Sequence, residues 1–107
     1  MTKIKRALTH KEINFPLKQI IGRYVPDTPN SQYYKNEAND LTFKLCERKE
    51  PTPLRPQYYL MQRLTSGAWV YLTSLYPRSN GTYVVEIQKQ YFKVLLSTDK
   101  GGFQVFH

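Results

Sequence analysis

Short runs of alternating apolar and polar residues, separated by turn residues, fill the chain after Asp40 and constrain its fold more than any other feature. Leu41, Phe43 and Leu45 alternate with polar neighbours, which is the period of a half-buried strand. Further strands are predicted at residues 57–64, 68–76, 82–88, 92–97 and 103–106. The loops between several of these runs are short and contain glycine, as in antiparallel hairpins. We therefore predict a mainly β (α+β) fold, with an antiparallel sheet of about five strands, curled or closed into a partial barrel.

Residues 14–24 predict one short N-terminal helix. Its apolar face would consist of Leu17, Ile20, Ile21 and Tyr24, which lie at helical spacing. Pro16 suits the first turn of a helix, and Pro26 would end it. Gly22 opposes the prediction, because an interior glycine destabilises a helix by about 1 kcal/mol.

The segment 86–96 is compatible with two structures. Its apolar residues Ile87, Tyr91, Val94 and Leu95 fall at helical spacing. The β-branched run at Val84 and Val85 just before them, and the absence of a capping residue, favour a strand. We predict a strand and keep the helix as the alternative.

The length of 107 residues predicts a single domain over residues 1–107. Residues 1–13 are expected to form a flexible basic arm. Residues 26–40 are rich in proline, asparagine and aspartate, and residues 49–56 contain three prolines, so both segments are predicted to be loops. Neither loop is long enough to separate two hydrophobic cores.

The register of the first hairpin decides which side chains share a face of the sheet. If residues 65–67 form a three-residue loop, one face collects Tyr59, Met61, Arg63, Trp69 and Tyr71. Aromatic planes beside an arginine are typical of a stacking platform for single-stranded bases.

The second hairpin argues against an exposed platform. With residues 77–81 as its loop, the same face continues through Tyr83, Val85 and Ile87, which are apolar. We therefore predict that the aromatic face is the core, with Arg63 reaching the edge or lying over the Trp69 ring. A loop one residue shorter or longer would reverse the assignment of faces.

The opposite face is then predicted to be an apolar surface formed by Leu60, Val70, Leu72 and Val84. Such a patch needs a cover. The predicted N-terminal helix could supply it; otherwise these four residues are predicted to form a protein interface.

The net charge is +8, and it is distributed unevenly. Residues 1–25 carry six basic side chains against one acidic, and residues 51–107 carry six against two, whereas residues 26–50 carry four against five. A positive field of this kind attracts polyanions, of which nucleic acid is the most common. Nucleic-acid contacts are predicted at Lys3, Lys5, Arg6, Lys11, Arg55, Tyr58, Arg63, Arg78, Lys89 and Lys93.

Catalytic and metal-binding patterns are scarce. His10 and His107 are the two histidines, Cys46 is the single cysteine, and no metal-ligand spacing or glycine-rich phosphate loop appears. We predict no catalytic residue, no metal and no cofactor. A metal-free ribonuclease that uses the terminal His107 for proton transfer remains the third hypothesis.

The leading hypothesis is a non-enzymatic nucleic-acid-binding protein, or an accessory subunit acting at nucleic acid, with weak sequence preference because no base-reading motif is present. The alternative is an adaptor or inhibitor that binds an acidic or nucleic-acid-bound protein through an exposed apolar or aromatic face. DNA or RNA as the ligand, and the oligomeric state, stay open. A cytoplasmic, non-membrane location is expected, because the chain has a single cysteine and neither an export signal nor a membrane span is visible.

Overall fold

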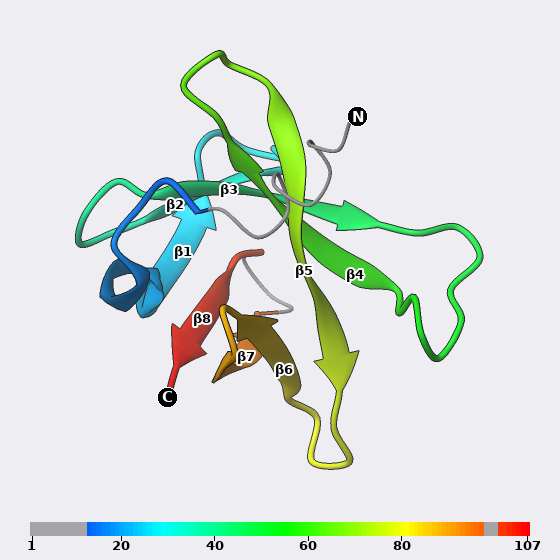
Figure 1. The fold of residues 1–107 in the computed structure, drawn as a ribbon. Coiled ribbons are helices and arrows are strands. Elements are labelled where there is room, and N and C mark those ends of the chain that lie inside the picture. The colour runs from blue at the N-terminus through cyan, green and yellow to red at the C-terminus, as the bar shows by residue number, and fades with distance from the viewer. Residues whose placement is uncertain (1–12, 98–100) are drawn as a thin grey trace, which may run out of the picture.

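The computed structural model describes residues 13–97 and 101–107. Within this part of the chain, eight antiparallel strands close into a barrel in sequence order (Figure 1). Each strand pairs with the next, and β8 closes the barrel by pairing with β1. The strands are β1 (Gly22–Pro26), β2 (Tyr33–Asn36), β3 (Thr42–Glu47), β4 (Tyr58–Arg63), β5 (Trp69–Pro77), β6 (Tyr83–Ile87), β7 (Gln90–Leu96) and β8 (Phe103–Phe106).

The predicted mainly β, antiparallel architecture is confirmed, but the strands are more numerous than predicted and the barrel is closed. One reason is that β2 lies within residues 26–40, which were predicted to be a loop. Only four residues long, β2 is too short for its alternation to stand out among turn residues. Residues 49–56 do lie outside the strands, as predicted.

The predicted helix at residues 14–24 is wrong. A single 3₁₀ turn, η1 (Leu17–Ile20), precedes β1. Gly22 has φ of +141°, and a Cβ atom there would lie 2.8 Å from Nδ2 of Asn36. That amide donates hydrogen bonds to the carbonyl oxygens of Gln19 and Ile21, both at 3.2 Å. The buried Asn36 therefore occupies the carbonyls that a continuing helix would use, and the chain turns into β1. None of the helical structure in the described residues is long and apolar enough to cross a membrane.

Residues 86–96 form strands, which confirms the preferred prediction and excludes the helix. The stretch is nevertheless interrupted, because β6 ends at Ile87 and β7 begins at Gln90. Gln88 and Lys89 join them with φ values of 52° and 66°, the conformation of a two-residue type I′ hairpin turn. Neither residue is the asparagine or glycine that normally marks such a turn, so the sequence conceals it.

The core fills the barrel interior. Ring stacking links three of its strands: Tyr24 lies between Phe43, at a centroid distance of 5.5 Å, and Phe103, at 4.6 Å. The Tyr24 hydroxyl donates to the carbonyl of Ile20 at 2.8 Å, and burial raises its pKa. The barrel is therefore packed around apolar residues from all parts of the described chain, chiefly Ile20, Tyr24, Phe43, Leu60, Leu75, Val85, Val94, Phe103 and Val105.

A β-bulge on β5 reverses the predicted assignment of faces. Met61 pairs with Tyr71 as predicted, but Leu60 pairs with Thr73, so Leu72 is an extra residue on β5. Leu72 and Thr73 are consecutive and both buried, at 6% and 4% exposure. As a result Tyr71 faces outward whereas Leu75, four residues later, faces the core.

The second hairpin keeps the predicted inward side. Tyr76 pairs with Val84 and Pro77 with Tyr83, so the loop comprises residues 78–82, one position later than predicted. The shift moves both ends of the loop and preserves parity. Val85 and Ile87 are therefore buried, as predicted. The predicted assignment of faces fails at the bulge. The inward face of the second hairpin was continued onto the face of the first hairpin that points outward.

The predicted interface of Leu60, Val70, Leu72 and Val84 is therefore wrong as an exposed patch. Leu60 is fully buried and Leu72 nearly so, because the bulge places this face inside the barrel. Val70 and Val84 are half-buried. The barrel itself therefore covers Leu60 and Leu72, whereas Val84 alternates with the buried Val85 and lies on the outer side of β6.

Candidate nucleic-acid interface

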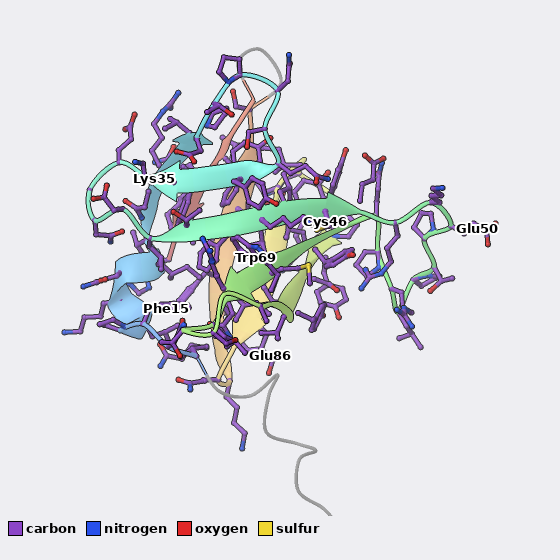
Figure 2. The ribbon with its side chains drawn as sticks, turned by 90° about the horizontal axis from the view of Figure 1, so that it is seen from above. Phe15, Lys35, Cys46, Glu50, Trp69 and Glu86 are labelled. Atoms are coloured by element: carbon purple, nitrogen blue, oxygen red, sulfur yellow. The ribbon has the colours of Figure 1, made fainter. Side chains whose placement is uncertain are left out.

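The outer surface of β2–β5 carries the residues that the sequence grouped as a stacking platform. We call the set Tyr33, Lys44, Tyr59, Met61, Arg63, Trp69 and Tyr71 the platform. Pairing places Tyr33 beside Lys44, Lys44 beside Met61, and Met61 beside Tyr71, which forms one row across four strands. Arg63 lies opposite Trp69 in the adjacent row. Figure 2 labels Lys35, Cys46 and Trp69, which come from β2, β3 and β5 on this side of the barrel.

The four aromatic rings of the platform meet in two pairs. The centroids of Tyr33 and Trp69 lie 5.2 Å apart with an interplanar angle of 38°. Those of Tyr59 and Tyr71 lie 6.0 Å apart at 36°. Tyr33 and Tyr71 are 38% and 37% exposed, so part of each ring is open to solvent. The accessible aromatic surface of the platform therefore lies at the two ends of one row, at Tyr33 and Tyr71.

Cations contact three of these rings. The Nζ atom of Lys44 lies 5.9 Å from the centroid of Tyr33, and the guanidinium carbon of Arg63 lies 5.9 Å from that of Trp69. Arg48, just after β3, lies closer, with its guanidinium carbon 4.5 Å from the centroid of Tyr59. These distances are within the range of cation–π attraction. Positive charge and aromatic surface are thus interleaved.

Hydrogen bonds hold Arg48 in place. Its Nη1 donates to the carbonyl of Pro56 at 2.6 Å, and Nη1 and Nη2 lie 3.4 and 3.5 Å from the Ser74 hydroxyl oxygen. The Ser74 and Tyr71 hydroxyls are hydrogen-bonded at 2.8 Å. The Arg48 guanidinium is therefore held in one position by Pro56 and Ser74.

Burial, followed by the neighbouring Cys46, raises the pKa of Tyr59, while the cations Arg48 and Arg55 oppose this effect. The Tyr59 ring therefore stays neutral over the physiological range. The Tyr59 hydroxyl thus adds no negative charge to the platform.

Two hollows lie at the ends of the platform. The first, about 360 Å³, is lined by Asp27, Tyr33, Thr42, Arg63 and Trp69, and we call it the tryptophan hollow. The second, about 680 Å³, is bounded by Arg48, Lys49, Arg55, Tyr59 and Tyr71, and we call it the arginine hollow. The arginine hollow joins three cations and two rings and suits phosphate contact. The tryptophan hollow combines rings with one charge of each sign.

The structure brings two of the predicted nucleic-acid-binding residues to this surface. Arg63 lies on the platform and Arg55 lines the arginine hollow. Tyr58 faces the other way: it packs against the core, with its ring 6.2 Å from that of Tyr83 at 85°. Burial, followed by the negative charge of Glu47, raises the pKa of Tyr58. Tyr59, which is half-buried, lies on the platform side instead, because adjacent strand residues face opposite sides.

The other predicted cations do not join the platform. Arg78 lies in the loop before β6, and Lys89 in the turn after it, so the length of β6 separates them. Lys93 is exposed on β7. The predicted contacts in the N-terminal arm, at Lys3, Lys5, Arg6 and Lys11, lie outside the described residues, so they stay predictions.

Sequence reasoning missed Tyr33, Lys44 and Arg48 as parts of the site. Tyr33 was hidden by the prediction of a loop at residues 26–40. Lys44 had a usable signal, because it lies on the polar side of the alternating strand at residues 41–46. Nothing local marks Arg48, whose partners Pro56 and Ser74 are distant in sequence.

The described residues contain no group of three or more His, Cys, Asp and Glu side chains able to hold a metal ion. Cys46 is 8% exposed beside Tyr59, and the His107 ring lies against Phe92 at 5.9 Å, beyond the end of β8. Cys46 lies on β3 and His107 follows β8, and these two strands do not pair with each other.

Comparisons with protein-family models, with curated proteins and with solved structures returned no match to this chain.

Proposed function

We propose that this protein binds single-stranded nucleic acid on the platform and acts without catalysing a reaction on it. The observation that carries the proposal is the outward-facing group of four aromatic rings on β2, β4 and β5, three of them in contact with a lysine or arginine. Aromatic planes interleaved with cations are what a single strand requires, because its bases stack and its phosphates need neutralising.

The platform and the arginine hollow beside it have distinct tasks in this mechanism. The exposed rings of Tyr33 and Tyr71 and the half-buried ring of Trp69 stack with bases, at about 1–3 kcal/mol per base. Lys44, Arg48 and Arg55 neutralise phosphates along the strand. Stacking accepts every base, so most of the platform is expected to show little sequence preference.

A single strand suits this surface better than a duplex. In a duplex the base faces are stacked on one another and are not available to protein rings. The platform also lies on a sheet, and no helix of the described residues is long enough to enter a groove.

The adaptor hypothesis loses its main support, because Leu60 and Leu72 of the proposed apolar patch are buried in the barrel. No geometry in the described residues favours the ribonuclease hypothesis. Binding without catalysis is therefore the function we carry forward.

The single tryptophan of the chain is Trp69, so its fluorescence reports directly on the platform. We would titrate the full chain with thymine-tract DNA and uracil-tract RNA of about 12 nucleotides, and with a duplex of equal length. We expect at least one single strand to quench Trp69 and to bind more tightly than the duplex, with an affinity that falls steeply with salt. Failure of both single strands to bind at about 50 mM salt would overturn the proposal.

A further inference from the structure

The tryptophan hollow contains a carboxylate, and a carboxylate would repel the phosphates that the platform is proposed to bind. Asp27 lines it together with Arg63, Tyr33 and Trp69. A negative charge beside a nucleic-acid backbone weakens binding, unless it accepts hydrogen bonds from a base. The inference drawn from Asp27 rests on the proposed function and concerns which base the platform recognises.

The backbone holds Asp27 at a fixed position relative to Tyr33. Asp27 follows the last residue of β1, and its N–H donates to the carbonyl of Tyr33 at 2.8 Å. The Tyr33 N–H in turn donates to the hydroxyl of Ser31 at 2.9 Å, and the same hydroxyl lies 3.4 Å from the Tyr33 carbonyl oxygen. The loop between β1 and β2 is thereby tied to the first residue of β2.

Both charged groups of the hollow are free to meet a ligand. Among the described residues, no hydrogen bond or ion pair engages the Asp27 carboxylate, which is exposed. The Arg63 guanidinium lies over the Trp69 ring and forms no ion pair with Asp27. The hollow therefore presents one acceptor group and one donor group beside an aromatic plane.

Guanine is the base that matches this arrangement. Its N1–H and N2–H donors are adjacent and suit a carboxylate, and its O6 and N7 acceptors are adjacent and suit a guanidinium. Adenine and cytosine place a single amino group beside an acceptor, and thymine or uracil place a single N–H between two acceptors. We infer that the tryptophan hollow is a guanine-selective subsite: Asp27 accepts from the Watson–Crick edge, Arg63 donates to O6 and N7, and Trp69 or Tyr33 stacks on the ring.

The volume of the hollow, about 360 Å³, lies within the range of small-ligand pockets, about 300–1,000 Å³. The hollow would thus select guanine at one position of a bound strand, whereas the other positions would accept any base through stacking alone.

The test measures the affinity of the full chain for thymine tracts, or uracil tracts if RNA is preferred, with one central residue changed to each other base. A single guanine is expected to tighten binding roughly tenfold over adenine, cytosine or thymine at the same place. Inosine, which lacks the N2 amino group, should lose most of this gain.

The matched variants are Asp27→Asn and Glu50→Gln, which change the net charge equally. Glu50 is exposed in the loop between β3 and β4, as Figure 2 shows, and does not line the tryptophan hollow. Asp27→Asn should make guanine and inosine bind alike while the unmodified tract binds at least as tightly as before. Glu50→Gln should leave the guanine preference intact.

The outcomes separate this inference from the proposed function. If the tract binds and quenches Trp69 but all four bases bind alike, the guanine subsite is wrong and single-strand binding stands. If guanine is preferred equally by the wild type and Asp27→Asn, Asp27 is not the group that recognises it. If no tract binds, both proposals fail.

Discussion

The outer surface of β2–β5 and that of β6–β8 are made by the same barrel and the same alternation of side chains, yet they differ in content. The platform on β2–β5 carries four rings in two contacting pairs, and cations lie over three of them. The surface of β6–β8 carries one large exposed ring, Tyr91, among Glu86, Lys93, Leu95 and Gln104. Among the described residues, no other ring or cation contacts Tyr91.

The difference shows that exposure alone does not identify the candidate site. Tyr91 is 65% exposed, more than Tyr33 at 38% or Tyr71 at 37%. The Tyr91 ring is paired with a carboxylate and has no cation over it, although Lys93 lies two residues away on β7. Tyr91 pairs directly with Glu86, whereas Tyr33 pairs directly with Lys44. The arrangement of rings and charges across the strands is therefore the informative feature.

The largest expected effect tests which residues face outward at all. Leu60 is fully buried and its neighbour Met61 belongs to the platform. Leu60→Asp buries an unpaired charge and should destabilise the fold by about 4 kcal/mol or more, whereas Met61→Asp should cost less than about 1 kcal/mol. Urea denaturation followed by circular dichroism measures both. Equal destabilisation by the two variants would mean that the bulge, and with it the comparison of the two surfaces, is wrongly placed.

The next effect compares rings on the two surfaces. Trp69→Ala removes a stacking plane from the platform and should weaken single-strand binding about 30-fold, because a stacked base contributes about 1–3 kcal/mol. Tyr91→Ala removes the more exposed ring from the other surface and should change binding less than about twofold. A labelled oligonucleotide followed by fluorescence anisotropy serves both variants, since Trp69 itself is lost in one. Comparable losses would assign binding to the whole barrel rather than to the platform.

Much of the fold could be predicted from the sequence, because alternation and turn residues act locally. The hairpin at residues 65–67 has the predicted register, with Arg63 opposite Trp69 and Leu64 bonded to Ala68. The strand β1 could not be predicted in this way, since its start depends on Asn36, which is distant in sequence and takes the carbonyls of the preceding turn.

The sequence predicted which residues of the candidate site share a face, but not which side of the barrel that face is on. The sequence grouped Tyr59, Met61, Arg63, Trp69 and Tyr71 on one face, and the structure keeps them together. The sequence pattern assigned that face to the core. The extra residue Leu72 exchanges the inward and outward sides along β5, and no residue type in the sequence indicates a bulge there. Side chains on a strand alternate between the two faces, so a shift of one residue exchanges the inward and outward faces. The assignment of faces is therefore correct only if the pairing of every residue along the strand is correct.

The smallest effect compares charges rather than rings. Lys44→Glu on the platform and Lys93→Glu on β7 change the net charge equally, so any difference between them is local. Lys44 contacts the Tyr33 ring, and its reversal should weaken single-strand binding about fivefold and reduce the slope of log affinity against log salt by about 1. Lys93→Glu should lower affinity only through the long-range electrostatic field of the protein. It should leave the slope nearly unchanged, because Lys93 lies outside the platform and contacts no phosphate in the proposed mode of binding. If the two slopes change equally, phosphates reach β7 as well, and the bound strand must wrap beyond the platform around the barrel.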